Sequence, residues 1–380
     1  MKKFNFFLSC AASAMFAIAL TSCEAVKDNP GTGFDPSLKD VTIQSGDTLA
    51  PIYKKLAATT NDIIIEIPAG VDTVYTGKIE LTPGQTFTLV GDKDNPPVVV
   101  PTASMKFGNT FTIKNVIFDC SEFTNHLLMM TKGDAADESL KVQSGQYVIK
   151  TPVVIENVVA KGLTKAFFYD NGAPYAFEEF TVNNCIVGYK AQGNVVLNLN
   201  NAMAINFYVV NSTFYSEDKN TAANLIALSG KRPWQITGYE DKEGLFVCSF
   251  NTFANIAYKK SIFNTNTLKG QTKYTFAVAN NIFYNTANKL YEKWFGNTGN
   301  ASKQLVAANN VYWCDGANVV ETTYTTDPGV NIDPQFKNLE PIYKDGKLVE
   351  DVSFRPTNFE FLNLKDIPGD PRWTQWVIKK

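Results

Sequence analysis

Few side chains of this 380-residue chain could act as acids, bases or nucleophiles in the usual enzyme arrangements. Its one histidine, His126, excludes a metal site built from several imidazoles, and any histidine-based triad would depend on that residue alone. We interpret His126 as a corner or strand-edge residue, because an apolar run, 127–130, follows it directly. Only three arginines are present to bind phosphate or carboxylate through paired hydrogen bonds, at positions 232, 355 and 372.

The charge balance bears on possible partners. The chain has 35 basic and 37 acidic residues and a formal net charge of −2. It therefore lacks the strong positive field that neutralises the phosphates of a nucleic acid. We expect no nucleic-acid partner.

Aromatic residues make up 13% of the chain and are the clearer chemical signal. Sugars present flat C–H faces, which stack on such rings. Trp234 is the best single binding candidate, because it stands beside Lys231 and Arg232; the alternative is that its ring only anchors a loop. The aromatic residues beyond those that the core repeat requires are Tyr169, Tyr175, Trp234, Tyr239, Tyr291, Trp294, Trp313, Trp373 and Trp376.

Carboxylates occur in two short runs, which matter because a glycoside hydrolase needs two carboxylates at a set separation. Asp134, Asp137 and Glu138 form the first run, and Glu178 with Glu179 forms the second. We interpret both runs as solvated loop surface.

The cysteines do not form a metal-binding pattern. No CxxC pair occurs, so we expect no zinc site and no other bound metal as a structural element. We interpret the widely separated cysteines as small buried apolar residues, although spacing alone leaves disulfide pairing open. These residues are Cys120, Cys185, Cys248 and Cys314.

A repeated phrase indicates the elements that must position these residues. In each copy an apolar residue stands four and two positions before a corner residue, and strand-type alternation links them. The spacing between corners ranges from 20 to 49 residues, which is typical of a solenoid whose coils stack on one another. The predicted corners are Asn115, Asn157, Asn184, Asn211, Lys260, Asn280 and Asn309.

Asparagine suits such a corner for two physical reasons. It tolerates a positive φ better than most residues do, and a tight bend between two strands needs one. Its amide can also bond the amide of the next coil, because stacked strands lie about 4.8 Å apart. We expect Lys260 to interrupt this ladder of amides.

The start of the chain is predicted to form two further structures. Residues 46–60 have the spacing of a short amphipathic helix, followed by a buried strand and turn at 63–70 and a further coil at 87–91 with Gly91 at its corner. We expect the helix to cap the first coil, since an uncovered coil would expose its apolar face.

Residues 1–22 resemble a bacterial lipoprotein signal peptide. Lys2 and Lys3 precede an uncharged apolar stretch, 4–20, and small residues then lead to Cys23. This resemblance implies that Cys23 carries a lipid and that the protein is anchored in the outer membrane, facing the cell exterior. Residues 23–38 have too few apolar residues to fold, and we interpret them as a tether.

Over about residues 40–340 the chain resembles the pectate-lyase-like superfamily. The features that carry this resemblance are the cap, the strand ending at residues 67–70 and the asparagine corners. More narrowly, the chain resembles Bacteroidota surface lipoproteins that carry domains of unknown function on that fold. The tail supports this likeness through Ile-Asp-Pro-Gln-Phe at 332–336 and Gly-Asp-Pro-Arg-Trp at 369–373. The resemblance implies an all-β fold, a right-handed single-stranded parallel β-helix with an N-terminal capping helix. It implies no particular activity, because this fold serves lyases, hydrolases, adhesins and binders.

In enzymes of this fold the active site is a groove on one sheet. The resemblance implies that this sheet here contains the strands 127–132, 166–170, 195–199 and 225–229, with the insertions 119–150 and 215–250 as walls. We expect Lys132, Asp170 and Asn198 to form one row along it. The candidate carbohydrate-binding residues are Trp234, Arg232, Lys231, Tyr169, Asp170 and Lys132.

A polysaccharide lyase is the main catalytic alternative. It would need a base near the sugar and cations to neutralise a uronate, and Lys132, Lys165, Lys231 and Arg232 are available for this. Asp134 and Asp170 could bind calcium, the one cofactor left open. The chain has neither the arginine-centred signature of pectate lyases nor the Asn-Thr-Asp, Asp-Asp and Gly-His-Gly set of polygalacturonases. No catalytic residue is carried over.

We therefore predict a β-helix over residues 39–340 and a C-terminal segment, 341–380, that packs on it. The preferred function is capture of a polysaccharide at the cell surface without catalysis. A lyase or glycoside hydrolase acting on a uronic-acid-containing glycan is the second hypothesis, and a structural or adhesive spacer is the third.

Overall fold

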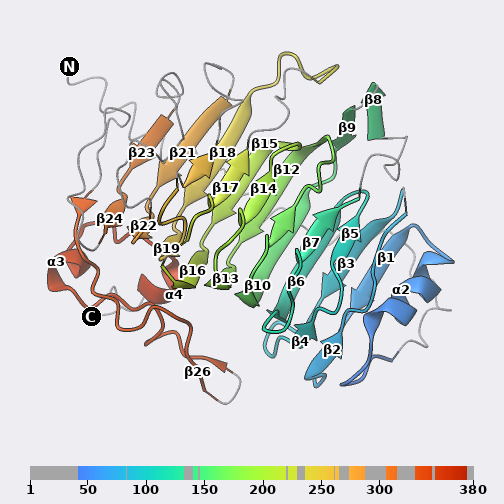
Figure 1. Ribbon diagram of the computed structural model, residues 1–380, viewed down its shortest axis with the longest axis horizontal. Helices are drawn as coiled ribbons and strands as arrows, with labels where there is room; N and C mark the ends of the chain where they lie inside the picture. The colour runs from blue at the N-terminus through green and yellow to red at the C-terminus, as the bar shows by residue number, and fades with distance from the viewer. Residues whose placement is uncertain are drawn as a thin grey trace. The chain divides into compact units, whose positions relative to one another are not determined.

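The computed structural model describes residues 42–82, 84–131, 140–143, 146–219, 221–228, 236–260, 262–264, 274–286, 305–314, 330–344 and 347–374. The predicted signal peptide, the lipidation site Cys23 and the tether lie outside these residues. The predicted all-β parallel β-helix is confirmed: parallel strands follow one another in chain order from the N-terminal helix α2 to β23 (Figure 1).

Each coil contributes strands to a large sheet that bends at a corner. We call the strands that lead to the corner the first arm and those that leave it the second arm; β6 and β10 run through the corner and belong to both. The first arm contains β1 (Asp62–Glu66), β3 (Thr86–Val90), β6 (Phe111–Asp119), β9 (Gln146–Ile149), β10 (Val153–Leu163), β12 (Tyr175–Asn183), β15 (Met203–Val210), β18 (Gly244–Ser249), β21 (Tyr274–Ala279) and β23 (Leu305–Ala308). The second arm adds β2 (Thr73–Tyr75), β4 (Val98–Val100), β13 (Ile186–Ala191), β16 (Thr213–Asp218), β19 (Thr252–Ala254), β22 (Ile282–Tyr284), β24 (Val311–Trp313) and β25 (Val330–Asn331).

A separate six-stranded sheet closes each coil. Its strands are β5 (Met105–Phe107), β7 (Leu128–Met130), β11 (Phe168–Tyr169), β14 (Leu197–Leu199), β17 (Ile226–Leu228) and β20 (Phe263–Asn264). β8 (Lys141–Gln143) pairs antiparallel with β9, and β26 (Tyr343–Lys344) with β27 (Lys347–Leu348). β7, β11, β14 and β17 lie within the four segments predicted for the groove sheet, so that expectation is confirmed.

The core is a set of aromatic stacks that run through the coils. Phe180, Phe207 and Phe246 occupy one register position of the first arm, with ring centroids 5.5 and 5.4 Å apart. Phe214, Phe253 and Phe283 do the same in the second arm, at 5.5 and 5.0 Å. Each coil thus buries its apolar face against its neighbours, as a solenoid must.

The corners are formed as the sequence predicts in six coils. Asn115, Asn157, Asn184, Asn211, Asn280 and Asn309 all have φ between +50° and +56°. Asn157 Nδ2 donates to Asn115 Oδ1 (3.0 Å), Asn184 Nδ2 to Asn157 Oδ1 (2.6 Å) and Asn309 Nδ2 to Asn280 Oδ1 (2.7 Å). Asn211 Nδ2 instead reaches the neighbouring Asn183 Oδ1 (3.0 Å).

The seventh corner is Phe250, and the prediction of Lys260 is wrong. Phe250 has φ +55° and separates β18 from β19, which pair with β15 and β16 of the preceding coil. Residues 258–260 instead form a turn after Ala257, itself at φ +52°. Both segments have the apolar spacing of the repeat and neither has asparagine at the corner, so the spacing could not tell them apart.

A second, fully buried polar ladder follows the corners. Asn251 Nδ2 donates to Asn281 Oδ1 (3.0 Å), and Asn281 Nδ2 donates to Asn310 Oδ1 (3.0 Å). The backbone N–H groups of Ser212 and Cys185 join it, donating to Asn251 Oδ1 (3.0 Å) and Ser212 Oγ (3.0 Å) respectively. Buried amides are stable only when paired, so this inner ladder fixes the register of the coils.

The predicted cap is α2 (Leu49–Ala57), which buries Leu49, Tyr53 and Leu56 against the first coils. β1 does not form the fully buried strand that was expected, because Ile64 is 54% exposed. None of the helices in the part of the chain that the structure describes has the length and hydropathy needed to cross a membrane.

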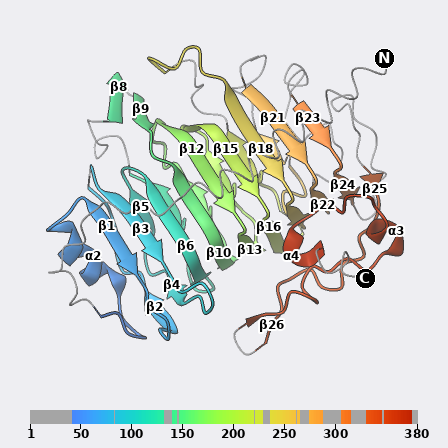
Figure 2. The same ribbon diagram turned by 180° about the vertical axis from the view of Figure 1, so that it is seen from behind.

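The C-terminal residues pack on the outer side of the second arm. Phe354 and Trp373 bury Ile186, Tyr215 and Ala254, and the short helix α3 (Phe359–Leu362) places Phe361 against Ile282 and Val311. The last helix, α4 (Pro371–Thr374), lies beside β16 when the molecule is viewed from behind (Figure 2).

The corner geometry leads to a stability prediction. Asn157→Ala removes two ladder hydrogen bonds, each contributing about 1 kcal/mol. It also places alanine, which cannot form the local hydrogen bonds of asparagine, at a positive φ, at a cost of about 1 kcal/mol. We expect urea unfolding to show a loss of about 2–4 kcal/mol. Asn157→Gly removes the same bonds without the backbone strain, so it should lose about 1 kcal/mol less. Equal losses in both variants would contradict a role for the positive φ.

Candidate functional site

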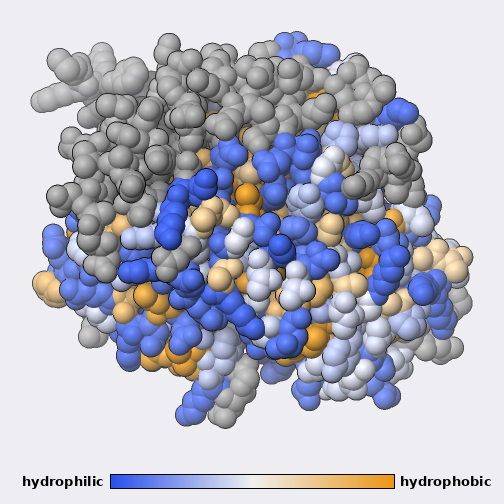
Figure 3. All heavy atoms as spheres, in the orientation of Figure 1, coloured by the Kyte–Doolittle hydropathy of each residue, from blue (hydrophilic) through white to orange (hydrophobic). Residues whose placement is uncertain are grey.

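The outward side of the six-stranded sheet carries one side chain from each coil. The β-bridge register aligns them in a single row: Lys106, Met129, Tyr169, Asn198, Ala227 and Asn264. Met129 and Ala227 are buried, so the accessible members are the other four. Neighbouring members are one strand spacing apart, about 4.8 Å. In the orientation in which β7, β14 and β17 are labelled, the surface shows small apolar patches among hydrophilic residues (Figures 1 and 3).

Tyr169 stands inside this row, and the ring of His126 packs against it from outside the row. Both are half-buried, and their ring centroids lie 4.3 Å apart with the planes tilted by 30°. His126 immediately precedes the apolar run that contains β7, as expected of a strand-edge residue, and its Nδ1 accepts a hydrogen bond from the backbone N–H of Ala166 (3.2 Å). Ring-on-ring contact holds the tyrosine in place while leaving part of its surface exposed.

The protonation state of His126 follows from its surroundings. Burial lowers the pKa of the imidazole, and the positive charge of Lys165 lowers it further. Because Nδ1 accepts a bond from the backbone, the neutral ring carries its proton on Nε2. At neutral pH, His126 is therefore a hydrogen-bond donor through Nε2 and is not a cation.

The polar members of the row are fixed by local bonds. Asn198 Oδ1 accepts from the backbone N–H of Asn200 (3.2 Å), which leaves Nδ2 as the donor of its amide. Lys106 Nζ pairs with Glu80 Oε1 (3.1 Å) at the end of the row. The face thus combines an aromatic surface with amide, imidazole and ammonium donors.

Asp170 does not belong to this surface, although the sequence made it a candidate. Its side chain is fully buried, and its carboxylate accepts hydrogen bonds from the backbone N–H groups of Gly172 (3.0 Å), Asn201 (2.5 Å) and Ala202 (2.9 Å). Burial raises its pKa, and these N–H groups act in the opposite direction. The carboxylate ties together the turns of two neighbouring coils and is not available to a glycan or to calcium.

The expected row of Lys132, Asp170 and Asn198 is corrected accordingly. The register pairs Asn198 with Tyr169, one residue before Asp170, and a shift of one residue turns a side chain to the other face. Lys132, Lys231, Arg232 and Trp234 lie outside the described residues, as do the acidic run at 134–138 and Tyr291, Trp294 and Trp376.

The acidic pair Glu178–Glu179 is not loop surface as interpreted from the sequence. Both residues belong to β12 and are half-buried. Phe177 and Phe180 both point into the core, so the strand places two consecutive carboxylates on its outer side, where Tyr239 Oη donates to Glu178. Burial raises the pKa of Glu179, opposed by its hydrogen bond with Thr181. This pair lies on the first arm and not on the six-stranded sheet.

The insertions were expected to wall the groove, but four of their described residues pack elsewhere. Val142 and Val148 of the first insertion, with Ile236 and Tyr239 of the second, pack over Ala176 and Ile205. Those two residues belong to β12 and β15, so this cluster covers the outer side of the first arm.

The remaining aromatic candidates are mostly structural. Tyr175, Tyr239 and Trp373 are buried, and Trp313 is half-buried on β24. Sequence reasoning missed the pairing of His126 with Tyr169, because they lie in different coils. Their place in consecutive strands of one sheet was the signal that could have indicated it.

Cysteine and metal chemistry do not define a site within the described ranges. Cys120, Cys185, Cys248 and Cys314 are buried, as the sequence suggested, and burial raises the pKa of the Cys185 thiol to about 12. Across those same ranges, no group of three or more His, Cys, Asp or Glu side chains is arranged to hold a metal ion.

Residues 58–217 match a family model described as a domain of unknown function. The matching model is that of DUF4957. The DUF4957 region begins directly after α2, ends within β16, and includes His126, Tyr169 and Asn198. No curated protein and no solved structure matches the chain.

The role of Asp170 within the DUF4957 region can be tested. Asp170→Asn replaces one carboxylate oxygen with an amino group that faces backbone N–H donors. We expect a loss of about 1–3 kcal/mol in the free energy of unfolding, because a buried donor is left without an acceptor. Urea unfolding measures this loss, with Asp218→Asn at the exposed end of β16 as the control. Unchanged stability with altered ligand binding would contradict a structural role.

Proposed function

We propose that this protein binds a polysaccharide on the outward face of the six-stranded sheet without chemically changing it. In this proposal a lipid on Cys23 holds it in the outer membrane, where the β-helix faces the exterior. The observation that carries the proposal is the half-exposed Tyr169 ring, supported by His126 and aligned with the Asn198 amide of the next coil.

The chemistry of this row suits a sugar chain. The Tyr169 ring offers an apolar face to the C–H groups of a pyranose, while His126 Nε2 and Asn198 Nδ2 offer donors to its hydroxyl groups. The stacked coils place the side chains of the row at regular intervals of one strand spacing. A linear polysaccharide likewise presents its sugar units at regular intervals. Extended contact along such a row needs little conformational change, because strands hold the side chains.

No specific observation favours the catalytic alternative over binding. The described carboxylates considered for catalysis are Glu178 and Glu179, which lie on the first arm, and Asp170, which is buried. The spacer alternative is disfavoured by the Tyr169–His126 pair, since a pure spacer needs no aromatic ring held half-exposed in a row of donors.

Glycan binding by Tyr169 is directly testable. A glycan array on the protein should identify a ligand, and calorimetry should then show that Tyr169→Ala weakens binding by about three- to tenfold, since one aromatic contact contributes about 0.5–1.5 kcal/mol. Tyr208→Ala is the matched control, because Tyr208 is half-buried on the outer side of β15 in the other sheet.

Three outcomes would count against the proposal. Equal loss in the two tyrosine variants would remove the six-stranded sheet as the binding face. Release of unsaturated sugars, followed by ultraviolet absorbance, would show a lyase. No binding to any glycan would favour the spacer.

The single histidine gives a pH prediction. Since the folded-state pKa of His126 is lowered, the unfolded chain takes up its proton first as the pH falls below about 6.5. The free energy of unfolding should therefore decrease as the pH is lowered from that value toward the folded-state pKa. NMR of the one imidazole should give a titration midpoint below about 6.5. His126→Asn keeps an acceptor for the N–H of Ala166, and its stability should change less over the same interval. A midpoint above 6.5 would be inconsistent with the packing described.

A further inference from the structure

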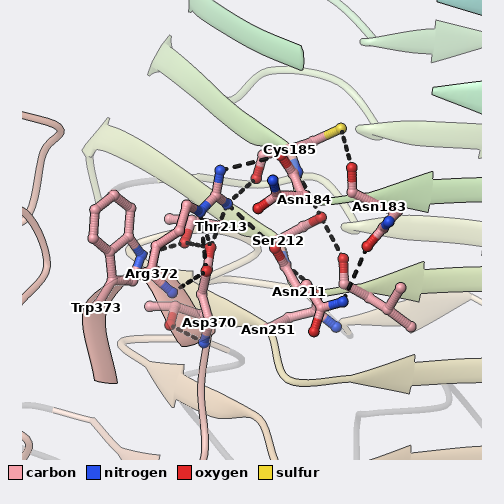
Figure 4. Close-up of polar contacts among 12 residues, drawn as sticks. Asn183, Asn184, Cys185, Asn211, Ser212, Thr213, Asn251, Asp370, Arg372 and Trp373 are labelled. Carbon is pink, nitrogen blue, oxygen red and sulfur yellow. Dashed lines mark hydrogen bonds and ion pairs between the residues drawn. The ribbon is translucent and has the colours of Figure 1, made fainter. Parts of the chain in front are cut away.

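A short segment near the end of the chain, Gly369–Thr374, docks at the corners of four consecutive coils. Figure 4 shows its polar contacts with the central ones. The partners that Asp370, Arg372 and Trp373 bond outside the segment are 118–188 residues away in the sequence. The segment contains the Gly-Asp-Pro-Arg-Trp motif, which the proposed function does not use.

Arg372 makes the most extensive contacts of this segment. Its Nη1 donates to the carbonyl of Asn184 (3.1 Å), and its Nη2 to those of Cys185 (2.7 Å) and Asn211 (3.3 Å). Only 13% of the side chain is exposed. A planar guanidinium can reach several carbonyl oxygens at once, whereas the ammonium of a lysine acts as a compact point charge.

Asp370 holds the guanidinium in place and is itself fully buried. Its carboxylate pairs with Arg372 and accepts from the hydroxyl of Thr213 (2.7 Å). Thr213 Oγ1 in turn accepts from the indole Nε1 of Trp373 (2.6 Å), and the Asp370 N–H donates to Thr252 Oγ1 (3.1 Å). Removal of any member leaves a buried polar group without its partner, which is costly.

The other two residues of the motif suit their positions. Gly369 has φ +101°, and a Cβ there would lie 2.5 Å from Ile282 Cδ1. Its N–H donates to the carbonyl of Asn280 (2.8 Å). Pro371 begins α4, where its missing N–H costs no hydrogen bond. The segment thus makes specific contacts with the corner residues of its own chain.

We propose that Gly369–Thr374 is a C-terminal latch that opens and closes as a unit. Closed, it locks the central second-arm strands β13, β16 and β19 at their corners. Open, it releases the C-terminal residues that cover the outer side of the second arm, where Phe354 packs against Ile186, Tyr215 and Ala254. The central coils therefore reach their final rigidity only when Gly369–Thr374 has docked.

Hydrogen exchange on the full chain tests the latch. In the unaltered protein, the amides of Gly369, Asp370 and Trp373 should exchange through one common opening that requires less free energy than the opening of first-arm amides such as Phe180. Arg372→Lys should accelerate that exchange about tenfold or more, and should also accelerate the corner amides of Asn184, Asn211 and Phe250. The corners at Asn115 and Asn157, which the latch does not touch, should be unchanged.

Arg355→Lys is the matched control, because Arg355 lies in the same C-terminal region and donates to the carbonyl of Asp351 (3.1 Å), away from the corners. If Arg372→Lys does not fold, Thr213→Val removes two latch hydrogen bonds from the strand side with almost no change in shape, and should also accelerate latch exchange. Latch amides that exchange only with global unfolding in the unaltered protein would overturn the proposal. An equal acceleration of all corners, or none, would do the same.

Discussion

The architecture depends on one local constraint, the left-handed backbone conformation at each corner. A coil can turn from the first arm to the second within one residue only if that residue accepts a positive φ, and asparagine does so while its amide bonds the next coil. Every other feature follows from the resulting register. It aligns the aromatic stacks of the core and the row on the six-stranded sheet, and it presents corner carbonyls to Arg372.

Much of this fold could be predicted because its signals are local and repeated. Six corner asparagines, the capping helix and the strands of the six-stranded sheet follow from short spacings. The corner at Phe250 could not be predicted, because phenylalanine ordinarily avoids a positive φ. There the neighbouring coils impose the corner conformation on the backbone. The interpretation of Glu178 and Glu179 as solvated loop surface was wrong because both belong to β12, and Tyr239 from a distant insertion bonds Glu178 there.

The candidate site was less predictable than the fold. Tyr169 could be selected as an aromatic residue on a groove strand, but Asp170 next to it could not be excluded, since alternation alone does not say which of two neighbours faces outward. The stacking of His126 on Tyr169 and the docking of Arg372 join residues that are far apart in the sequence. Such contacts depend on how the coils are aligned, which a single sequence does not reveal.

The two amide ladders also have an electrical consequence. In the corner ladder the side-chain N–H groups point toward the N-terminal coils, from Asn184 to Asn157 and from Asn157 to Asn115. In the inner ladder they point the opposite way, from Asn251 to Asn281 and from there to Asn310. Hydrogen-bonded amides in a line polarise one another, so each ladder carries a dipole along the stack. Because the two dipoles point in opposite directions, they do not add to a single dipole along the whole stack.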